Sequence, residues 1–433
     1  MVGDLVVEVL EEGAGIHGPR TVGRAGGGLG RDSGGGTMGR PMPHVLVVAY
    51  GGGHINALLP VIDRLRTRPG WQVTVLALTT AAATCAARNV PIIGLRDLPV
   101  QDDASRRHGE RLAAALPPNP NVPREESVAY LGCSYRDLEA AEGVAGASAR
   151  YAAEGRAAFL PIPTFTAVLD HLRPDLVLST SAPRAERAVL AAAGLRGVPS
   201  VCVVDLFALS EEAWVGQPGF ATRVCVPMEI VRQRLVSLGR QPDEVVVTGN
   251  PVFDRLGDPA LRQRAADLRR QRGWEGRQVV LWASQPEPQD PTRPRRVEAA
   301  LVAAMAANPA RLLLIRPHPN DQYDLPPIGP QVAHSTRADD LAATLAAADT
   351  VVTMTSTVGL EAALLGRPVV TFDGSINTPF APYSRMGISR GALTLDALAP
   401  ALDDALAGTG PSPDLPAPGG ATDAVLRVID GLL

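Results

Sequence analysis

Three glycines and a histidine stand directly after a short apolar run near residue 45. The run Val45–Ala49 predicts a strand, and apolar positions recur at helical spacing after His54. Glycines at such a turn let the backbone approach a ligand closely, and the helix N-terminus presents free N–H groups to negative charge. A histidine there can act as a general base, or it can simply cap the turn. We predict His54 as a catalytic base, on a turn formed with Gly51, Gly52, Gly53 and Asn56.

This turn lacks the fingerprint of a dinucleotide-binding domain. That fingerprint requires the spacing GxGxxG and an acidic residue about 20 positions later. Gly53 is followed by His-Ile-Asn, so the third glycine is missing. The glycines therefore indicate a turn that faces a ligand without indicating which ligand.

A second polar motif, Arg-Pro-His-Pro, follows the apolar run that begins at Leu312. Ligands of open α/β sheets bind at the carboxyl ends of the strands. Arg316 and His318 are therefore candidates for contacting an anionic substrate. They alternate along the backbone, so they need not face the same way, and a solvated loop is the alternative interpretation.

A third motif, the sequence TSTVGLE at Thr355–Glu361, marks a junction between a strand and a helix. Hydroxyl and N–H groups at a helix start can hold phosphate. A capping box does not explain Glu361, because Val358 stands three residues earlier, where Ser or Thr is required. We therefore predict that Glu361 accepts hydrogen bonds from the two vicinal hydroxyls of a ribose.

Alternating strands and helices must position these motifs. Continuous apolar runs predict strands buried on both faces, as in a parallel sheet covered by helices. The runs fall into two series, 45–49, 73–78, 175–179, 200–204 and 244–248, then 279–284, 312–319, 350–353 and 369–374. Helices are predicted near 184–193, 297–307 and 339–349. The predicted fold class is α/β, with two Rossmann-like, doubly wound domains facing each other across a cleft.

The motifs together resemble those of nucleotide-sugar enzymes with the GT-B fold. GHINALLPVIDRL (53–65) resembles a segment of antibiotic and macrolide glycosyltransferases and of the peptidoglycan GlcNAc transferase. EAALLGRP (361–368) resembles the core motif of nucleotide-sugar glycosyltransferases. VTGNPVFD (247–254) resembles the interdomain segment of the peptidoglycan enzyme and of UDP-GlcNAc 2-epimerases. RPHP with TSTVG is also similar to motifs of capsule-type transferases that use CMP- or CDP-linked donors. The resemblance covers about residues 44–408, and no single family fits throughout.

The resemblance implies a metal-independent glycosyltransferase that moves a sugar from a nucleotide-sugar donor to a small-molecule or cell-envelope acceptor. The acceptor would enter the N-terminal domain near His54, and the donor, expected to be a UDP-sugar, would bind the C-terminal domain. Two alternatives stay open, a nucleotide-sugar 2-epimerase and a GT-B protein that binds its ligand without catalysis. The implied donor site comprises Arg316, His318, Ser356 and Thr357 at the diphosphate, Glu361 at the ribose and Asp373 at the sugar hydroxyls, together with Asn250, Ser284 and Gly359.

Three departures from these families bear on the prediction. Thr353 and Thr355 stand where macrolide-type enzymes carry His and Gly ahead of the motif's Glu. The stretch 179–181 reads Ser-Thr-Ser where an Asp usually holds the catalytic His, so Asp205, after the run 200–204, is our candidate for that second catalytic residue. Gly51–His54 stands in place of the Arg-Pro-Glu loop of the epimerases.

The chain divides into four predicted parts. Residues 1–41 are rich in Gly and Arg without a hydrophobic period, which predicts a disordered extension, and we favour a start at Met42 or Met38. Residues 42–250 form the acceptor-binding domain and 251–410 the donor-binding domain. Residues 411–433 form a linker and a helix that packs back on the N-terminal domain. The polar stretch 101–155 is either a floppy insertion or a lid that binds the acceptor.

Composition excludes several other functions. A net charge of −4 gives no reason to expect nucleic acid or an anionic membrane as partner, and no apolar run is long enough to span a membrane. The chain contains no lysine, which excludes Schiff-base and P-loop chemistry. Its four cysteines lack metal-ligand spacing, and Cys202 and Cys225 lie in apolar runs, as expected in a reducing cytoplasm. We predict no cofactor and no metal site.

Overall fold

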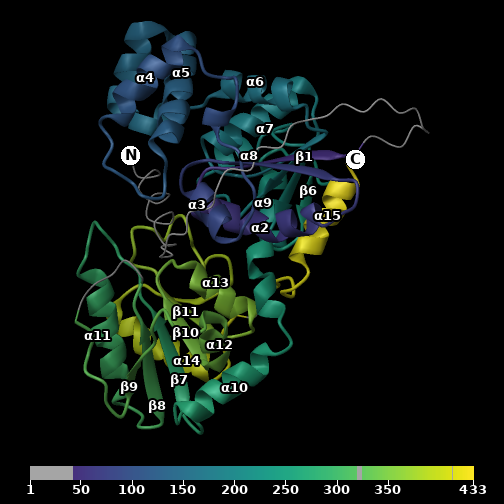
Figure 1. The fold of residues 1–433 in the computed structure, drawn as a ribbon. Helices are drawn as coiled ribbons and strands as arrows, with labels where there is room; N and C mark the ends of the chain where they lie inside the picture. The colour runs from purple at the N-terminus through teal and green to yellow at the C-terminus, as the bar shows by residue number, and fades with distance from the viewer. Residues whose placement is uncertain (1–41, 319–323, 412) are drawn as a thin grey trace.

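Two six-stranded sheets, each flanked by helices, form two domains that lie one above the other in Figure 1. The structure is a computed structural model that describes residues 42–318, 324–411 and 413–433. Every strand pairing within the two sheets is parallel. The predicted fold class is confirmed, and the predicted extension 1–41 lies outside the described residues.

The first domain is built on the sheet ordered β2-β1-β3-β4-β5-β6. Its strands are β1 (His44–Ala49), β2 (Gln72–Ala77), β3 (Leu176–Thr180), β4 (Ser200–Val203), β5 (Arg223–Val226) and β6 (Val245–Val247). Its helices are α2 (Gly52–Arg66), α3 (Thr79–Ala87), α4 (Asp103–Ala113), α5 (Arg124–Glu154), α6 (Ile162–Leu172), α7 (Ala185–Arg196), α8 (Glu212–Val215) and α9 (Glu229–Ser237).

The second domain is built on the sheet ordered β12-β11-β10-β7-β8-β9. Its strands are β7 (Gln278–Ala283), β8 (Arg311–Arg316), β9 (Val332–His334), β10 (Thr350–Thr353), β11 (Val369–Phe372) and β12 (Arg390–Ala392). Its helices are α10 (Leu261–Gln271), α11 (Arg293–Met305), α12 (Leu341–Ala347), α13 (Thr357–Leu364) and α14 (Leu398–Leu406), and the last helix of the chain is α15 (Ala421–Asp430).

The strand order shows where a ligand-binding crevice is expected in each sheet. In the first sheet the order reverses between β1 and β3, and in the second between β7 and β10. Loops that leave neighbouring strands at such a point diverge to opposite faces and open a crevice at the carboxyl ends of the strands. The Gly51–His54 turn follows β1, and the Thr355–Glu361 motif follows β10. Both motifs therefore stand at the topological switch point of their own sheet.

The stretch 101–155, for which a floppy insertion was one interpretation, is an ordered helical hairpin. Its helices α4 and α5 lie side by side at the edge of the first domain (Figure 1). Two glycines permit this close packing, because a Cβ on Gly109 would lie 2.0 Å from the Val128 carbonyl oxygen and one on Gly132 would lie 1.9 Å from that of Ser105. The helix α5 bends at Gly143, where φ is 73°. Glycine adopts this conformation with little strain, because it has no Cβ.

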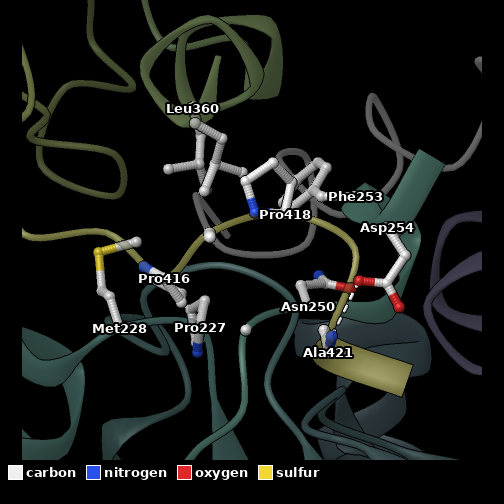
Figure 2. Close-up of a pocket in the computed structure, with 12 residues that line it drawn as sticks. Pro227, Met228, Asn250, Phe253, Asp254, Leu360, Pro416, Pro418 and Ala421 are labelled. Carbon is white, nitrogen blue, oxygen red and sulfur yellow. Dashed lines mark hydrogen bonds between the residues drawn. The ribbon is translucent and has the colours of Figure 1, made fainter. Parts of the chain in front are cut away.

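The chain crosses between the domains twice. The first crossing is the short helical segment Pro251–Gly257, here called the hinge segment, and the second leads into α15. Asp254 of the hinge segment joins the two crossings, since its carboxylate accepts a hydrogen bond from the backbone N–H of Ala421 at 2.9 Å (Figure 2). It also accepts one from the backbone N–H of Thr422 at 2.7 Å. The helix α15, yellow in Figure 1, then packs on the first domain, where Val425 and Ile429 share a core with Leu58 of α2.

Candidate functional site

His54 and Glu186 form the polar centre of the crevice in the first domain. His54 is the third residue of α2, and Glu186 is the second residue of α7. The imidazole Nδ1 lies 3.2 Å from the Glu186 Oε1, and the same oxygen accepts a hydrogen bond from the Tyr50 N–H at 2.6 Å. The Glu186 side chain is 1% exposed and that of His54 is 15% exposed. A buried carboxylate thus holds a histidine that reaches the surface of the crevice.

The carboxylate beside His54 differs from the one we predicted. Asp205 was our candidate for the partner of His54, whereas the structure places Glu186 there, 132 residues along the chain from His54. Asp205 follows β4, and its backbone carbonyl accepts a hydrogen bond from the Asn250 side chain at 2.7 Å. A catalytic role for Asp205 itself stays a prediction.

A second carboxyl group of this crevice, Glu211, titrates near neutrality. Burial, and after it the negative charge of Asp205, raise its pKa to about 7, and a hydrogen bond from Ser210 opposes this rise. The charge of His54 also acts on Glu211, which places the two groups within electrostatic reach. A carboxyl group with this pKa exists in both protonation states at neutral pH, as acid–base catalysis requires.

Sequence reasoning missed both Glu186 and Glu211. A signal existed for Glu186, because it shares one face of its helix with Val189 and Leu190, and a glutamate on an apolar face must find a buried partner. No comparable pattern marks Glu211, which lies in an irregular loop before α8.

The switch point of the second domain gathers hydroxyl and amide groups. Ser284 follows β7 and is buried, and its hydroxyl has no hydrogen-bond partner among the described residues. The next residue, Gln285, clamps the start of the α13 motif, because its amide oxygen accepts from the Thr355 N–H at 2.9 Å and its amide nitrogen donates to the Thr355 hydroxyl at 2.8 Å. Gln285 was not among the predicted site residues.

Ser356 caps the N-terminus of α13. Its hydroxyl accepts a hydrogen bond from the Val358 N–H at 3.3 Å, and its carbonyl accepts one from the Tyr383 hydroxyl at 2.9 Å. Thr357 is the first residue of the helix. Gly359 lets the helix lie close to β10, because a Cβ there would lie 3.1 Å from the Thr353 methyl group. Two of the four residues predicted at the diphosphate, Ser356 and Thr357, therefore stand at the start of one helix.

Glu361 lies one turn further along α13 and is buried. It forms an ion pair with Arg255 of the hinge segment. Burial raises the pKa of Glu361, while the positive charges of Arg255 and then Arg316 lower it. Arg316 donates a hydrogen bond to the Ser335 hydroxyl at 2.8 Å. Glu361 and Arg316 are therefore electrostatic neighbours although 45 residues separate them in the sequence.

The remaining predicted residues lie in loops after other strands, β6, β8 and β11. Both carboxylate oxygens of Asp373 accept hydrogen bonds, one from Thr371 at 2.7 Å and the other from Ser384. Asn250 caps the hinge segment by accepting from the Val252 N–H at 3.0 Å. His318 immediately precedes the gap 319–323 in the described residues. The sugar, ribose and phosphate contacts assigned to these residues stay predictions.

The two switch points belong to neighbouring parts of the molecule. Phe207, in the loop after β4, packs edge-on against Tyr383, with ring centroids 5.4 Å apart. Tyr383 in turn donates to the carbonyl of the α13 cap. These contacts join the loops at the carboxyl end of the first sheet to those of the second.

A small pocket beside the hinge segment is distinct from the two switch points. It lies between the hinge segment, α13 and the chain before α15, and its walls are mostly apolar, with Phe253, Leu360 and Pro418 among them (Figure 2). Its polar groups are already engaged, Asn250 with the Val252 N–H and Asp254 with the start of α15. The pocket is therefore a poor match for a charged, hydroxyl-rich ligand.

The described residues hold neither a metal-binding cluster nor a membrane-spanning helix. Across 42–318, 324–411 and 413–433, no three His, Cys, Asp or Glu side chains gather closely enough to hold a metal ion. Within the same ranges, no helix is both long and apolar enough to cross a membrane.

The sequence matches one family model, described as UDP-N-acetylglucosamine 2-epimerase, over residues 219–375. No curated protein matches the chain significantly. The matched stretch runs from the segment before β5 to the loop after β11. It contains every residue of the predicted donor site, from Asn250 to Asp373, whereas His54, Glu186 and Asp205 lie outside it.

Solved structures share the fold at low sequence identity. UDP-GlcNAc 2-epimerase from Neisseria meningitidis bound to UDP-GlcNAc is 14% identical, with a TM-score of 0.55, and the match covers 90% of this chain and 99% of that one. The enzyme from Methanocaldococcus jannaschii in complex with UDP-GlcNAc and UDP is 12% identical, with a TM-score of 0.52 and coverages of 90% and 99%. The glycotransferase of kitacinnamycin is 18% identical, with a TM-score of 0.55 and coverages of 91% and 100%.

These comparisons correct our main functional prediction. The family model that fits the second domain is that of an epimerase, and several of the structures that share the fold are UDP-GlcNAc 2-epimerases. The glycosyltransferase prediction was wrong, and the findings favour its alternative. What is established is a GT-B-like fold shared with the UDP-GlcNAc 2-epimerases, with a second domain similar in sequence to theirs.

Proposed function

We propose that the protein is a nucleotide-sugar 2-epimerase, which binds a UDP-linked N-acetylhexosamine between its two domains and inverts carbon 2 of the sugar. One observation carries this proposal. The stretch that matches the epimerase model also holds the predicted donor-binding residues, and three of them, Ser284, Ser356 and Thr357, follow the strands β7 and β10 at the switch point of the second sheet.

The second domain would bind the nucleotide. The N–H groups at the start of α13 and the Arg316 guanidinium suit a diphosphate, since helix N-termini and arginine both stabilise anionic oxygens. Glu361, one turn along the helix, would accept hydrogen bonds from the ribose hydroxyls. Burial and an arginine partner hold this carboxylate in place before a ligand arrives.

The first domain would supply the proton transfers. Inversion at carbon 2 requires that a C–H bond breaks on one face of the ring and forms on the other, so groups that take and give protons are needed. His54 and Glu211 lie at the carboxyl end of the first sheet within electrostatic reach of each other. The pKa of Glu211, raised to about 7 by burial, lets it serve as either acid or base.

The first domain departs from the epimerase pattern at one place. Gly51–His54 stands where those enzymes carry Arg-Pro-Glu after the first strand. The Gly52 N–H donates a hydrogen bond to the Thr80 hydroxyl at 2.9 Å. This N–H group is therefore already engaged within the protein. We therefore assign the ligand-facing role on this turn to the His54 side chain.

The test is incubation of the purified protein with UDP-N-acetylglucosamine in D₂O, followed by proton NMR. The expected result is loss of the signal from hydrogen 2 of the sugar, together with new signals of the carbon-2 epimer, without any added acceptor. Binding is measured separately by thermal unfolding, because a ligand at 100 times its Kd stabilises a protein by about 2.7 kcal/mol. Binding of UDP-N-acetylglucosamine without exchange at carbon 2 would contradict the proposed function.

A further inference from the structure

Glu186 is a buried carboxylate with an unusual set of neighbours. One oxygen, Oε1, contacts both the Tyr50 N–H and the His54 Nδ1, and the other, Oε2, is buried without a hydrogen-bond partner among the described residues. A half-satisfied buried carboxylate is costly, because each unmet acceptor loses its hydration. Such a group persists where it does something that an apolar side chain cannot do.

A purely structural role explains part of this arrangement. Glu186 stands in the first turn of α7, where the helix dipole favours negative charge, and its bond to Tyr50 ties α7 to the end of β1. An amide side chain could make the same bond to Tyr50. The structural role therefore leaves the contact with His54 unexplained.

The hydrogen bond with His54 has a defined direction. An ionised carboxylate can only accept, so the Nδ1 of His54 must be the donor. The neutral imidazole then carries its proton on Nδ1 and keeps the lone pair on Nε2. Since Nδ1 faces the buried Glu186, the ring edge with Nε2 points away from Glu186.

We propose that Glu186 is a positioning residue for His54, which it holds as the Nδ1–H tautomer with Nε2 presented to the sugar. Glu186 does not itself touch the substrate. It fixes the ring orientation and, after Nε2 accepts a proton, stabilises the resulting imidazolium through its negative charge. This inference deepens the proposed function and rests on it for the identity of the substrate.

Other charged groups also act in this crevice. Glu211 and Asp205 lie on the loop between β4 and α8, and electrostatic effects connect them with each other and with His54. The Glu186 Oε1 lies 3.2 Å from the His54 Nδ1, so a change of tautomer in Glu186→Ala tests this contact.

The test is nitrogen-15 NMR of the full-length, ligand-free protein labelled on histidine, with the His54 signals identified by their loss in His54→Gln. The wild-type spectrum should show His54 in the Nδ1–H form at a pH where it is neutral. Glu186→Gln should keep this tautomer, because the amide oxygen can still accept the bond. Glu186→Ala should give the mixture of tautomers expected for a free imidazole.

Kinetics with UDP-N-acetylglucosamine provide a second measurement. Glu186→Gln removes only the charge and should lower kcat about 10-fold, whereas Glu186→Ala also frees the ring and should lower it about 100-fold. KM should change by less than about threefold in both variants, since neither removes a contact with the ligand.

The matched control is Glu126→Gln. Glu126 is also a buried carboxylate of the first domain and accepts the Leu95 N–H at 2.9 Å, on a different part of the domain. This control should leave both the His54 tautomer and kcat unchanged. It separates a positioning effect from the general loss of a buried charge.

The two proposals fail in different ways. If Glu186→Ala leaves the tautomer unchanged, or if wild-type His54 carries its proton on Nε2, Glu186 does not position His54, whatever reaction the protein catalyses. If the tautomer depends on Glu186 as expected but no exchange at carbon 2 occurs, the proposed function is wrong while the structural pairing stands.

Discussion

Arg255 and Glu361 form an ion pair that joins the hinge segment to α13 of the second domain, the face that we propose binds the nucleotide. Glu361 is buried, and burial raises its pKa, so the arginine is the nearby charge that most favours the ionised form. The side chain of Arg255 is 44% exposed. A ribose that binds Glu361 must therefore share the carboxylate with Arg255 or displace it, which couples nucleotide binding to the hinge.

We expect Glu361→Gln to weaken UDP binding. Charge-assisted hydrogen bonds contribute about 1.5–3 kcal/mol, so the Kd for UDP, measured by isothermal titration calorimetry, should rise roughly 10- to 100-fold. Unfolding should change little, because the variant also removes a buried charge. Glu298→Gln on α11, another buried carboxylate of the second domain, is the control and should bind UDP as the wild type does. Equal affinities for both variants would show that Glu361 does not contact the nucleotide.

We expect His54→Ala to lower the rate of exchange at carbon 2 without affecting nucleotide binding. A general base contributes about 10²- to 10⁴-fold to a rate, and His54 lies in the first domain, outside the predicted nucleotide site. The measurements are deuterium incorporation from D₂O and the Kd for UDP. Loss of UDP affinity with unchanged exchange would instead place His54 against the phosphate or sugar.

Glu211 should make stability depend on pH between about 4.5 and 7. Its pKa is raised from 4.5 to about 7 by burial and by Asp205, so the folded protein binds the proton more tightly than the unfolded chain. The stabilisation is fully present below pH 4.5 and is lost as the pH rises to 7, by up to about 3 kcal/mol.

Urea unfolding at pH 5 and pH 8 measures this effect. Glu211→Gln cannot ionise, so its free energy of unfolding should fall less than that of the wild type between the two pH values. Glu212→Gln, at the exposed ion pair with Arg234, should keep the wild-type difference. Identical pH dependence in wild type and Glu211→Gln would mean that Glu211 titrates at its ordinary pKa.

Removing the carboxylate of Asp254 should destabilise the first domain, although Asp254 lies on the hinge segment. It accepts N–H groups at the start of α15, and loss of such a cap costs about 0.5–2 kcal/mol. Asp254→Ala should therefore lower the Tm and increase hydrogen exchange in α15. The control is Asp423→Ala, also on α15, which removes an exposed ion pair with Arg64 of α2. It should have a much smaller effect on the Tm. A wild-type Tm for Asp254→Ala would rule out this capping role.

Gly109→Ala should disrupt the α4–α5 hairpin. The new Cβ would lie 2.0 Å from a backbone oxygen of α5, so one helix must move. Gly194→Ala on α7 is the control, because its nearest neighbour would be 3.8 Å away, and alanine there should stabilise the helix by about 1 kcal/mol. Hydrogen exchange measured by mass spectrometry should increase in 103–154 for Gly109→Ala only. Unchanged exchange would mean that the helices tolerate a wider separation.

The long buried strands could be predicted from the sequence, because continuous apolar runs such as Val45–Ala49 and Thr350–Thr353 have few other stable arrangements. Short strands could not. β9 and β12 have three residues each, and β12 has the sequence Arg-Gly-Ala. Pairing with the adjacent strand of the sheet, rather than local sequence preference, makes these segments strands.

The motifs proposed to face the nucleotide could be recognised from the sequence because they are local, and their contacts with a nucleotide stay predictions. The helix start at Ser356 and the strand end at Arg316 are each visible within a few residues of sequence. The contact between His54 and Glu186, on the side proposed to react, could not be predicted. It depends on β1 and β3 being neighbours in the sheet. The choice of reaction was missed for the same reason, because it depends on which side chains the first domain brings together.

The position of α15 has a consequence for how the chain folds during synthesis. Val425, Leu426 and Ile429 are buried in the first domain against α2, which begins at residue 52. Domains generally fold as units, the N-terminal one first, as the chain leaves the ribosome. Here the first domain is synthesised first, but part of its apolar surface stays uncovered until α15 has been synthesised after the second domain. The second domain can therefore be complete before the first, and the apolar face of α2 stays exposed to solvent until α15 covers it.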